Sequence, residues 1–459
     1  MSIQREPMSS VDQAWLRMDR DDNLMMICAV LVLDGVPDRA RLSQTIEHRL
    51  LAWPRFSQRV VRDGNRAWWE RDPHFHLDNH IHSVGLGGQG DRSALQQLAG
   101  DLASTPLDFR HPLWSLHLVD HYQEGAALIV RMHHCIADGL ALVRVLLSLT
   151  DEKPEGTPPA TRGAGSPVER AWHAAQAVSQ RLTEGVSQAM AQVGDAVRDP
   201  SQLLSWGKKG LAVGRELVDI GLLPADPPTA LTGQRSGRKQ VAWCEPLPLE
   251  QVRALAHRLG GTINDVLMTV AAGALREWLA SHESGCEGPL HVAVPFNLRP
   301  LDAPIRELGN QFGLVIVRLP VDEAAPLDRF RCVQAHMRAL KASPQPLVFY
   351  GMLALFGRGP ELMERLALDL LSRKASLVMT NVPGPGTPLY LAGQRIRQPL
   401  FWVPQSGLIG VGLSILSYAG TVQFGVISDE ALLAHPSELA DAFRHSFSAL
   451  EAASQHAGP

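Results

Sequence analysis

A histidine pair followed by an acid and a glycine is the feature of this sequence best suited to chemistry. The strand-like run AALIVRM ends in His133 and His134, and Asp138 and Gly139 follow at the start of an apolar helical segment. Imidazole is the side chain best matched to proton transfer near neutral pH, and a nearby carboxylate can fix its tautomer. Because consecutive side chains of a strand point to opposite faces, we expect only one of the two histidines to face a substrate. The motif predicts a general acid–base site, with Gly139 permitting a sharp exit into the helix.

Two other chemistries are open to the same motif. His133, His134 and Asp138 could ligate a metal ion, but adjacent histidines on a strand diverge, so we expect no metal and no cofactor here. Cys135 could carry an acyl group covalently, although a small buried thiol is more often a packing residue. The sequence contains no G-x-S-x-G nucleophile elbow, which fits transfer without an acyl-enzyme intermediate.

A second polar pair opens a helix farther along the chain. Asn264 and Asp265 stand at the start of an apolar-periodic segment, DVLMTVAAGALREWL. Asn and Asp are common helix N-caps, and an Asn amide can also donate a hydrogen bond to a developing oxyanion. The pair therefore predicts a cap, a contribution to the site, or both.

Two segments containing proline are expected to shape the fold rather than to perform chemistry. The first consists of Pro112, Leu113 and Trp114, and the second is Asn381-Val-Pro-Gly-Pro. Proline fixes φ, and tryptophan packs a large apolar area. We therefore expect both segments to define the surroundings of a site.

The surrounding sequence predicts a mixed α/β (α+β) chain of two domains. Residues 1–150 combine β-rich runs with helical patterns and carry the histidine motif. Residues 151–239 begin with a Pro/Gly/Thr-rich stretch and continue as a helical segment, which predicts a linker. Residues 240–459 predict a second mixed domain, and a site between two domains is a common arrangement. The clearest local patterns are strands at residues 26–33, 67–69 and 126–132 and helices at residues 38–51 and 92–103.

Composition excludes several classes of protein. The 459 residues include 43 Lys and Arg against 47 Asp and Glu, a formal net charge of −4, so the chain lacks the positive field of most nucleic-acid-binding proteins. Its five cysteines show no zinc-binding spacing, which indicates a reducing compartment. The N-terminus contains no uninterrupted apolar region, so we expect no signal peptide and a cytoplasmic location.

Two further segments imitate well-known signals. Residues 398–428 carry no charge, but they contain Pro404 and five glycines, so we expect two buried strands, at 410–416 and 421–427, rather than a membrane span. Residues 85–90 match G-x-G-x-x-G, but the preceding HIHSV is too polar for a central parallel strand. We expect a surface loop there rather than a nucleotide site.

Several segments, taken in chain order, resemble those of the bacterial wax ester synthase/diacylglycerol acyltransferases, a branch of the CoA-dependent acyltransferase superfamily. The run from His133 to Gly139 matches the HHxxxDG motif of the superfamily. The other matching segments are residues 8–16, 106–114, 261–266, 294–300, 308–310 and 380–385. The resemblance covers nearly the whole chain. It departs at Ser115, where the family pattern leads us to expect an acidic residue.

This resemblance implies two chloramphenicol acetyltransferase-like domains joined by a helical linker, with the active site between them. It implies an O-acyltransferase that moves a fatty acyl group from acyl-CoA to diacylglycerol or a long-chain fatty alcohol, giving triacylglycerol or wax ester. In that chemistry His134 is the general base and the Asn264 amide can bond the thioester oxygen, while Arg299 is a candidate partner of Asp138. The resemblance also implies peripheral contact with the inner face of the membrane or with lipid inclusions.

Two alternative functions stay open. The first is a condensation-type acyltransferase that uses carrier-bound acyl groups, which would share the HHxxxDG motif. The second is a non-catalytic lipid-binding protein of storage droplets that retains an acyltransferase scaffold. The intact His134 and Asp138 argue against the second.

Overall fold

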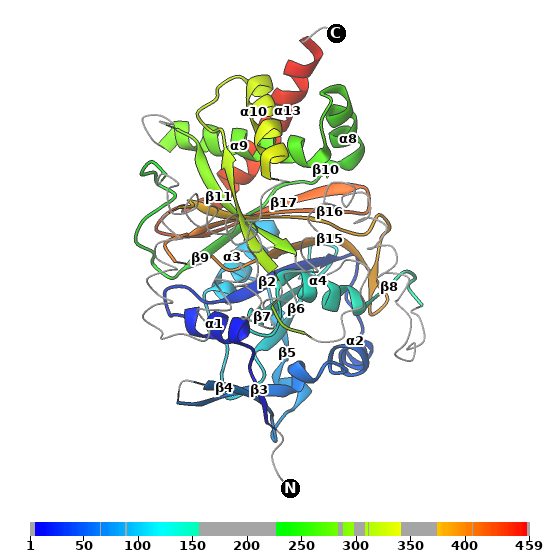
Figure 1. Cartoon of the computed structure of the whole chain (residues 1–459). Coiled ribbons are helices and arrows are strands. Elements are labelled where there is room, and N and C mark those ends of the chain that lie inside the picture. Colours follow the sequence, from blue (N-terminus) through cyan, green and yellow to red (C-terminus); the bar gives the residue numbers. More distant parts are fainter. Residues whose placement is uncertain are drawn as a thin grey trace, which may run out of the picture.

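The computed structural model describes residues 5–64, 66–87, 90–155, 226–282, 288–297, 308–310, 312–340, 374–405 and 407–456. Within these ranges the strands form two seven-stranded sheets and one three-stranded sheet. The two large sheets lie one above the other, with a group of helices above the second (Figure 1). The fold is the mixed α/β architecture that the sequence predicts. Most of the predicted linker, residues 151–239, lies outside the described residues.

The first sheet contains the strand that ends in the histidine motif. In spatial order its strands are β5 (Ile81–Gly85), β6 (Trp114–Tyr122), β7 (Gly125–His133), β2 (Met26–Leu33), β15 (Gln394–Trp402), β14 (Tyr390–Leu391) and β8 (Thr150–Asp151). All eight residues of β2 are buried, as expected for a strand covered on both faces. Both β14 and β15 fall within the predicted 240–459 domain, yet they complete this sheet. A division of the chain by residue number therefore does not reproduce the division between the sheets.

The second sheet contains the predicted strand pair of the uncharged segment. In order it consists of β10 (Leu247–Pro248), β17 (Thr421–Asp429), β16 (Val411–Tyr418), β13 (Leu377–Pro383), β11 (Leu290–Asn297) and β12 (Phe312–Leu319), and β9 (Lys239–Trp243) also pairs with β17. β16 and β17 form a hairpin whose two-residue turn, Ala419-Gly420, has positive φ at both positions, as tight hairpins prefer. No helix among the described residues has the length and apolarity needed to cross a bilayer.

The main helices cover the two sheets from different sides. Above the second sheet lie α8 (Leu249–Arg258), α9 (Ile263–His282), α10 (Pro326–Leu340) and α13 (Pro436–His456) (Figure 1). The first half contains α1 (Ser10–Met18), α2 (Arg39–Thr45), α3 (Arg92–Ala103) and α4 (Gly139–Ser148). The predicted helix at 92–103 is confirmed by α3. The one predicted at 38–51 begins as α2, capped by Asp38, and continues as a π-helical turn at Ile46–Leu50.

Smaller elements extend the first half. A three-stranded sheet contains β1 (Arg5–Pro7), β4 (Arg66–Arg71) and β3 (Gln58–Asp63), in the order β1-β4-β3. Short 3-10 turns occupy Pro54–Ser57 and Leu77–Asn79. The strand before the glycine-rich loop, β5, is an edge strand paired in parallel with β6, so it lacks the central position of a nucleotide-binding strand.

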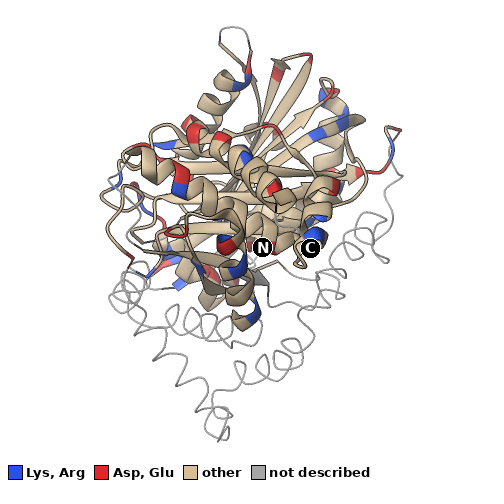
Figure 2. Cartoon of the chain, turned by 90° about the horizontal axis from the view of Figure 1, so that it is seen from above, with Lys and Arg blue, Asp and Glu red and all other residues tan. Residues whose placement is uncertain are grey.

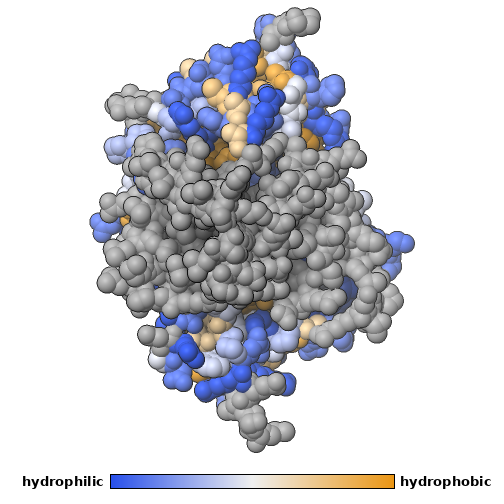
Figure 3. Space-filling view, viewed as in Figure 1, coloured by the Kyte–Doolittle hydropathy of each residue, from blue (hydrophilic) through white to orange (hydrophobic). Residues whose placement is uncertain are grey.

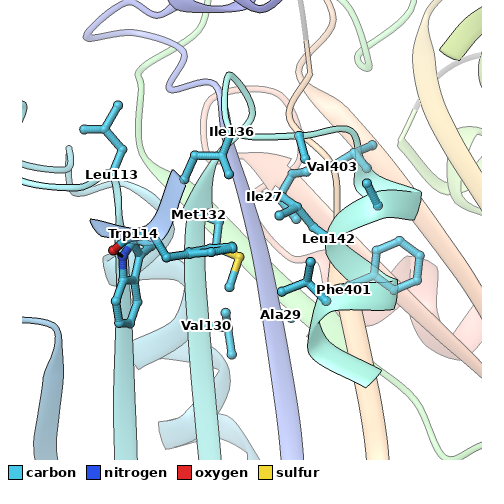
Figure 4. Packing of buried hydrophobic residues seen from close by; sticks show 14 of the residues in the cluster. Ile27, Ala29, Leu113, Trp114, Val130, Met132, Ile136, Leu142, Phe401 and Val403 are labelled. Atoms are coloured by element: carbon cyan, nitrogen blue, oxygen red, sulfur yellow. Dashed lines mark hydrogen bonds between the residues drawn. The ribbon is translucent and has the colours of Figure 1, made fainter. Parts of the chain in front are cut away.

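One hydrophobic core joins the two halves of the molecule. It combines Trp15 of α1 and Val130 of β7 with Phe312, Val378 and Leu416 from the second sheet, and part of it is drawn in Figure 4. Among the described residues, Val36 and Leu408 are the large hydrophobic side chains that are exposed. The described surface at the two ends of the molecule is mostly hydrophilic (Figure 3). Acidic and basic residues are interspersed along the described chain in the view from above (Figure 2).

Candidate active site

The histidine motif lies where β7 passes through a turn into α4. His133 is the last residue of β7, and the backbone N–H of His134 donates to the Met25 carbonyl at 2.8 Å. Asp138 is the N-cap of α4, and its Oδ1 accepts from the Ala141 N–H at 2.8 Å. An N-cap satisfies one of the backbone donors at the start of a helix. Asp138 therefore fixes the turn, as the sequence predicts, and it does so by capping the helix.

Gly139 is required for space and not for backbone conformation. It is the first residue of α4 and does not have a positive φ, so the exit into the helix does not use a conformation that only glycine favours. A Cβ at this position would lie 3.2 Å from Val403 Cγ1 and 3.9 Å from Ile27 Cδ1. Figure 4 shows Val403 and Ile27 beside Leu142 of α4. Glycine thus allows the start of α4 to approach β2 and the end of β15 closely.

The ring of His134 is enclosed by aromatic side chains. It stacks on Trp15 with centroids 3.9 Å apart, and the Phe312 ring is tilted beside it at 5.6 Å. The residue is 3% exposed, and its buried Nδ1 has no hydrogen-bond partner among the described residues. Burial lowers the pKa of His134 to about 4, although the nearby Asp138 carboxylate acts in the opposite direction. The ring is therefore neutral near neutral pH and can accept a proton.

His133 has quite different neighbours. Its Nδ1 accepts from the Cys135 N–H at 3.1 Å, and its Nε2 lies 3.5 Å from Asp19 Oδ1. Because Nδ1 is an acceptor here, we assign the proton of the neutral ring to Nε2. The edge of the ring meets Phe109 at 5.7 Å. The two rings thus diverge as strand alternation predicts, and His133 is engaged in holding the turn.

Helix α1 contributes to both histidines from one face. Asp12, Trp15 and the C-cap residue Asp19 are spaced at i, i+3 and i+7, a spacing that places side chains on the same side of a helix. Trp15 stacks on His134. Asp19 approaches His133 and also accepts from the Met25 N–H at 2.7 Å. In the sequence, residues 8–16 were notable only for their family resemblance, although the acid–aromatic–acid spacing that extends to Asp19 is a pattern from which a site role could have been predicted.

Asn310 brings the second half of the molecule to His134. Its Nδ2 donates to Asp12 Oδ1 at 2.7 Å and to the His134 carbonyl at 2.9 Å. Its backbone N–H donates to the same Asp12 oxygen at 3.0 Å. Three segments that match the family in sequence, those containing Asp12, His134 and Asn310, therefore meet at one point. Neither Asp12 nor Asn310 was predicted from the sequence to have a role of its own.

The two polar residues at the start of α9 have different roles: Asp265 belongs to the helix cap, and Asn264 does not. Thr262 and Asp265 form a capping box: the Thr262 N–H donates to Asp265 Oδ2 at 2.8 Å, and the Asp265 N–H donates to Thr262 Oγ1 at 3.1 Å, a reciprocal arrangement that stabilises helix starts. Asn264 is not the cap. Its Oδ1 accepts from Asn381 Nδ2 at 2.6 Å, which leaves its own Nδ2 as a donor. Contact between this amide and a thioester stays a prediction.

The Pro112-Leu113-Trp114 segment supports the motif from β6. The His133 N–H donates to the Leu113 carbonyl at 2.9 Å. Trp114 is buried, stacks on His80 at 4.4 Å and donates through Nε1 to the Phe56 carbonyl at 2.9 Å. Figure 4 shows its ring beside the strand that ends in the histidines. These contacts are structural, as the sequence predicts.

Ser115, the position that departs from the family pattern, faces a buried arginine. It pairs across the sheet with Arg131, whose Nη1 lies 3.5 Å from Ser115 Oγ and whose Nη2 donates to the Thr105 carbonyl. His117 Nε2 lies 3.1 Å from the same hydroxyl. Arg131 thus donates to neutral oxygens at the site where a carboxylate was expected.

The sequence also suggested roles for Cys135 and Arg299. Cys135 is fully buried, and burial together with Asp12 and Asp19 raises the pKa of its thiol well above the usual value, which disfavours the thiolate needed for covalent transfer. Arg299 lies outside the described residues. The described residues gather no set of three His, Cys, Asp or Glu side chains arranged to hold a metal ion.

Comparisons with known proteins agree along the whole chain. Residues 8–267 match the wax ester synthase/diacylglycerol acyltransferase catalytic domain, and residues 308–451 match the WS/DGAT C-terminal domain. A putative diacylglycerol O-acyltransferase of Mycobacterium tuberculosis (strain H37Rv) is 26% identical over 459 residues, covering 95% of this chain and 88% of the relative. A probable diacylglycerol O-acyltransferase of the same strain is 26% identical over 457 residues, with 94% and 93% coverage.

Solved structures of similar fold point the same way. A wax ester synthase/diacylglycerol acyltransferase from Marinobacter aquaeolei VT8 has a TM-score of 0.69 at 20% identity, covering 98% of this chain and 100% of that one. The first condensation domain of the calcium-dependent antibiotic synthetase has a TM-score of 0.59 at 16% identity, with 100% and 98% coverage. At these identities the likeness shows a shared fold, which includes both halves and the junction that holds His134.

Proposed function

This chain belongs to the wax ester synthase/diacylglycerol acyltransferase family, and from that premise we propose that it moves a fatty acyl group from acyl-CoA to diacylglycerol or a long-chain fatty alcohol. Acyl transfer itself is the activity named in its family and in its relatives. The products are triacylglycerol or wax ester. The observation that carries the proposal is a buried, neutral His134 at the junction of the two halves, between Trp15 and Phe312.

His134 acts as the general base in this mechanism. It takes the proton of the bound hydroxyl while the alkoxide oxygen bonds to the thioester carbonyl carbon. The C–S bond then breaks, and the same imidazolium gives its proton to the departing CoA thiolate. Proton transfer by a positioned imidazole typically raises a reaction rate 10²- to 10⁴-fold, and we assign about 10³-fold of the rate enhancement to His134. No covalent enzyme intermediate is required, in agreement with a buried Cys135 whose pKa is raised.

The surroundings of His134 suit this sequence of proton transfers. Burial keeps the ring neutral and so able to accept a proton, while the Asp138 carboxylate favours the imidazolium that forms briefly. An enclosed, aromatic environment also limits the access of water, which would otherwise hydrolyse the thioester. The Asn264 amide is the proposed donor to the developing oxyanion, as a preorganised N–H group stabilises charge that appears only in the transition state.

The test measures CoA release with and without acceptor. Purified protein is incubated with palmitoyl-CoA alone, with hexadecanol or with dipalmitoylglycerol, and free thiol and lipid products are quantified. We expect acceptor-dependent thiol release that His134→Ala abolishes. His80→Ala is the matched control, because His80 is equally buried at 3% exposure but contacts Trp114 and not Trp15. Equal thiol release with and without both acceptors would contradict the proposal.

Two further measurements, with an acyl carrier protein as donor and of lipid binding, would test the alternative functions. Transfer from an acyl-phosphopantetheinyl carrier protein, without transfer from acyl-CoA, would favour the condensation-type enzyme. Binding of the lipids without turnover would favour a non-catalytic lipid-binding protein. Peripheral contact with a membrane or lipid inclusion is part of the proposal, and flotation with vesicles that contain diacylglycerol tests it separately from catalysis.

A further inference from the structure

We propose that Asp12 and Asn310 form a clamp that positions His134 from the two halves of the molecule, a role that rests on the proton transfer proposed above. Asp12 belongs to α1, and Asn310 lies two residues before the start of the second-sheet strand β12, 298 residues farther along the chain. The Asn310 side chain is near enough to the His134 ring to oppose the lowering of its pKa by burial, but its hydrogen bond to His134 goes to the backbone carbonyl. Both are therefore positioning residues in this proposal, which act through the backbone of His134.

The clamp depends on the two protons of one amide group. Asn310 Nδ2 donates one to Asp12 Oδ1 and the other to the His134 carbonyl, at 2.7 and 2.9 Å. The His134 N–H is held separately by the Met25 carbonyl at 2.8 Å. The peptide groups on both sides of the His134 side chain are thus anchored, one by the first half and one by the second. Displacement of the His134 backbone, and with it the Cα that carries the ring, would require one of these bonds to break.

A carboxylate at position 12 fixes which way the Asn310 amide points. An ionised Asp is an acceptor only, whereas an Asn amide has a donor end and an acceptor end that can exchange places. Asp12 therefore selects the orientation with Nδ2 toward itself, and this same orientation directs the second N–H to the His134 carbonyl. Asp12 and Asn310 are each 4% exposed, so water has little access to compete for these groups.

The backbone before Asn310 is shaped for the same contact. Gly309 has a φ of +145°, in the range that favours glycine. A Cβ there would lie 3.6 Å from Asp12 Oδ2. This conformation lets both the backbone N–H and the side-chain amide of Asn310 reach the same Asp12 oxygen, at 3.0 and 2.7 Å. The carboxylate is thereby held by two donors from one residue.

Exchanging Asp12 and Asn310 distinguishes an effect on the position of His134 from an effect on the stability of the fold alone. In Asn310→Asp, two carboxylates face each other, and we expect a lower melting temperature and a kcat reduced about 10- to 100-fold with little change in KM, as for a misplaced catalytic group. The double variant Asp12→Asn/Asn310→Asp restores a donor–acceptor pair between the halves. It cannot donate to the His134 carbonyl, because the carboxylate at position 310 has no proton to give. We therefore expect the melting temperature to recover and kcat to stay low.

A chemical readout makes the test independent of turnover. Diethylpyrocarbonate modification of His134, measured by mass spectrometry relative to the equally buried His80, should rise in Asn310→Asp and in the double variant. Recovery of wild-type kcat by the double variant, or an unchanged modification ratio in both variants, would overturn the clamp. Absence of acyl transfer in the wild-type protein would overturn the proposed function instead, while the modification ratio still decides the clamp.

Discussion

The indole of Trp15 lies almost parallel to the imidazole of His134, with centroids 3.9 Å apart and an interplanar angle of 16°. The two residues come from α1 and from the end of β7, so the stack joins the N-terminal segment to the strand that carries the motif. It covers one face of the His134 ring and leaves that ring desolvated. The direction of the His134 pKa shift, downward through burial, follows from this enclosure.

Substitution of Trp15 should reduce catalysis in proportion to the stacking surface that is lost. Trp15→Phe keeps an aromatic ring against His134, and we expect a modest loss. Trp15→Leu removes the ring, and since a displaced catalytic group commonly costs about 10- to 100-fold, we expect a fall in kcat of about that size. Thiol-release kinetics would measure both. Equal kcat values for the two variants would show that the stack does not position His134.

The stability of the fold should depend on pH through His134. Its folded-state pKa is about 4, below the ordinary value near 6.5, so between these pH values the unfolded chain binds a proton that the folded chain does not. The free energy of unfolding should therefore fall as pH drops through this window, by up to about 3 kcal/mol from this residue.

The variant His134→Gln isolates that contribution. His117 also has its pKa lowered to about 4 by burial and contributes with the same sign, so the absolute slope is shared. The difference in the free energy of unfolding between wild type and His134→Gln, from urea denaturation at several pH values, should change by up to about 3 kcal/mol between pH 6.5 and pH 4, with the wild type losing stability relative to the variant. Parallel stability curves for the two proteins would contradict the assignment.

Cys135 should be dispensable for the chemistry. Its thiol is buried, and the neighbouring carboxylates of Asp12 and Asp19 add to the rise in its pKa, so the reactive thiolate is disfavoured. Cys135→Ala removes a single sulfur atom from a packed position. We expect kcat within about threefold of wild type, because the Cys135 N–H that holds His133 is retained and small core changes mainly affect stability. A loss as large as that of His134→Ala, or an acyl adduct on Cys135 found by mass spectrometry, would instead indicate covalent transfer.

Local patterns in the sequence predicted what depends on neighbours in the chain. Alternation and turn residues located β16 and β17, and helical periodicity located α3. The start of α4 followed from Asp138 and Gly139, although the close approach of Gly139 to Val403, the residue that follows β15, was not visible locally. Insertion of β14 and β15 into the first sheet was missed for the same reason.

The parts of the site that the sequence did not reveal depend on long-range contacts. Asp12 and Asn310 are 298 residues apart, and no period or spacing relates them. Each was noticed only within a segment that resembles the family. The histidine motif could be found because its functional residues lie within seven consecutive positions, whereas the residues that contact and position it come from both halves of the chain.

At the start of α9, the adjacent residues Asn264 and Asp265 allow a role in catalysis to be tested separately from a role in stability. Asp265 belongs to the capping box with Thr262, so Asp265→Ala should lower the free energy of unfolding by about 1 kcal/mol, the usual cost of a lost cap, with little effect on kcat. Asn264 takes no part in that box, and its amide is the proposed oxyanion donor. Asn264→Ala removes the hydrogen bond from Asn381, at a cost of about 1 kcal/mol similar to that of the cap, and should in addition lower kcat by about 10²-fold or more, as loss of such a donor does. Melting curves and thiol-release kinetics on both variants form a two-by-two comparison. If Asn264→Ala changes only the melting temperature, its bond to Asn381 is purely structural, and the oxyanion donor has to be sought among the other N–H groups around His134.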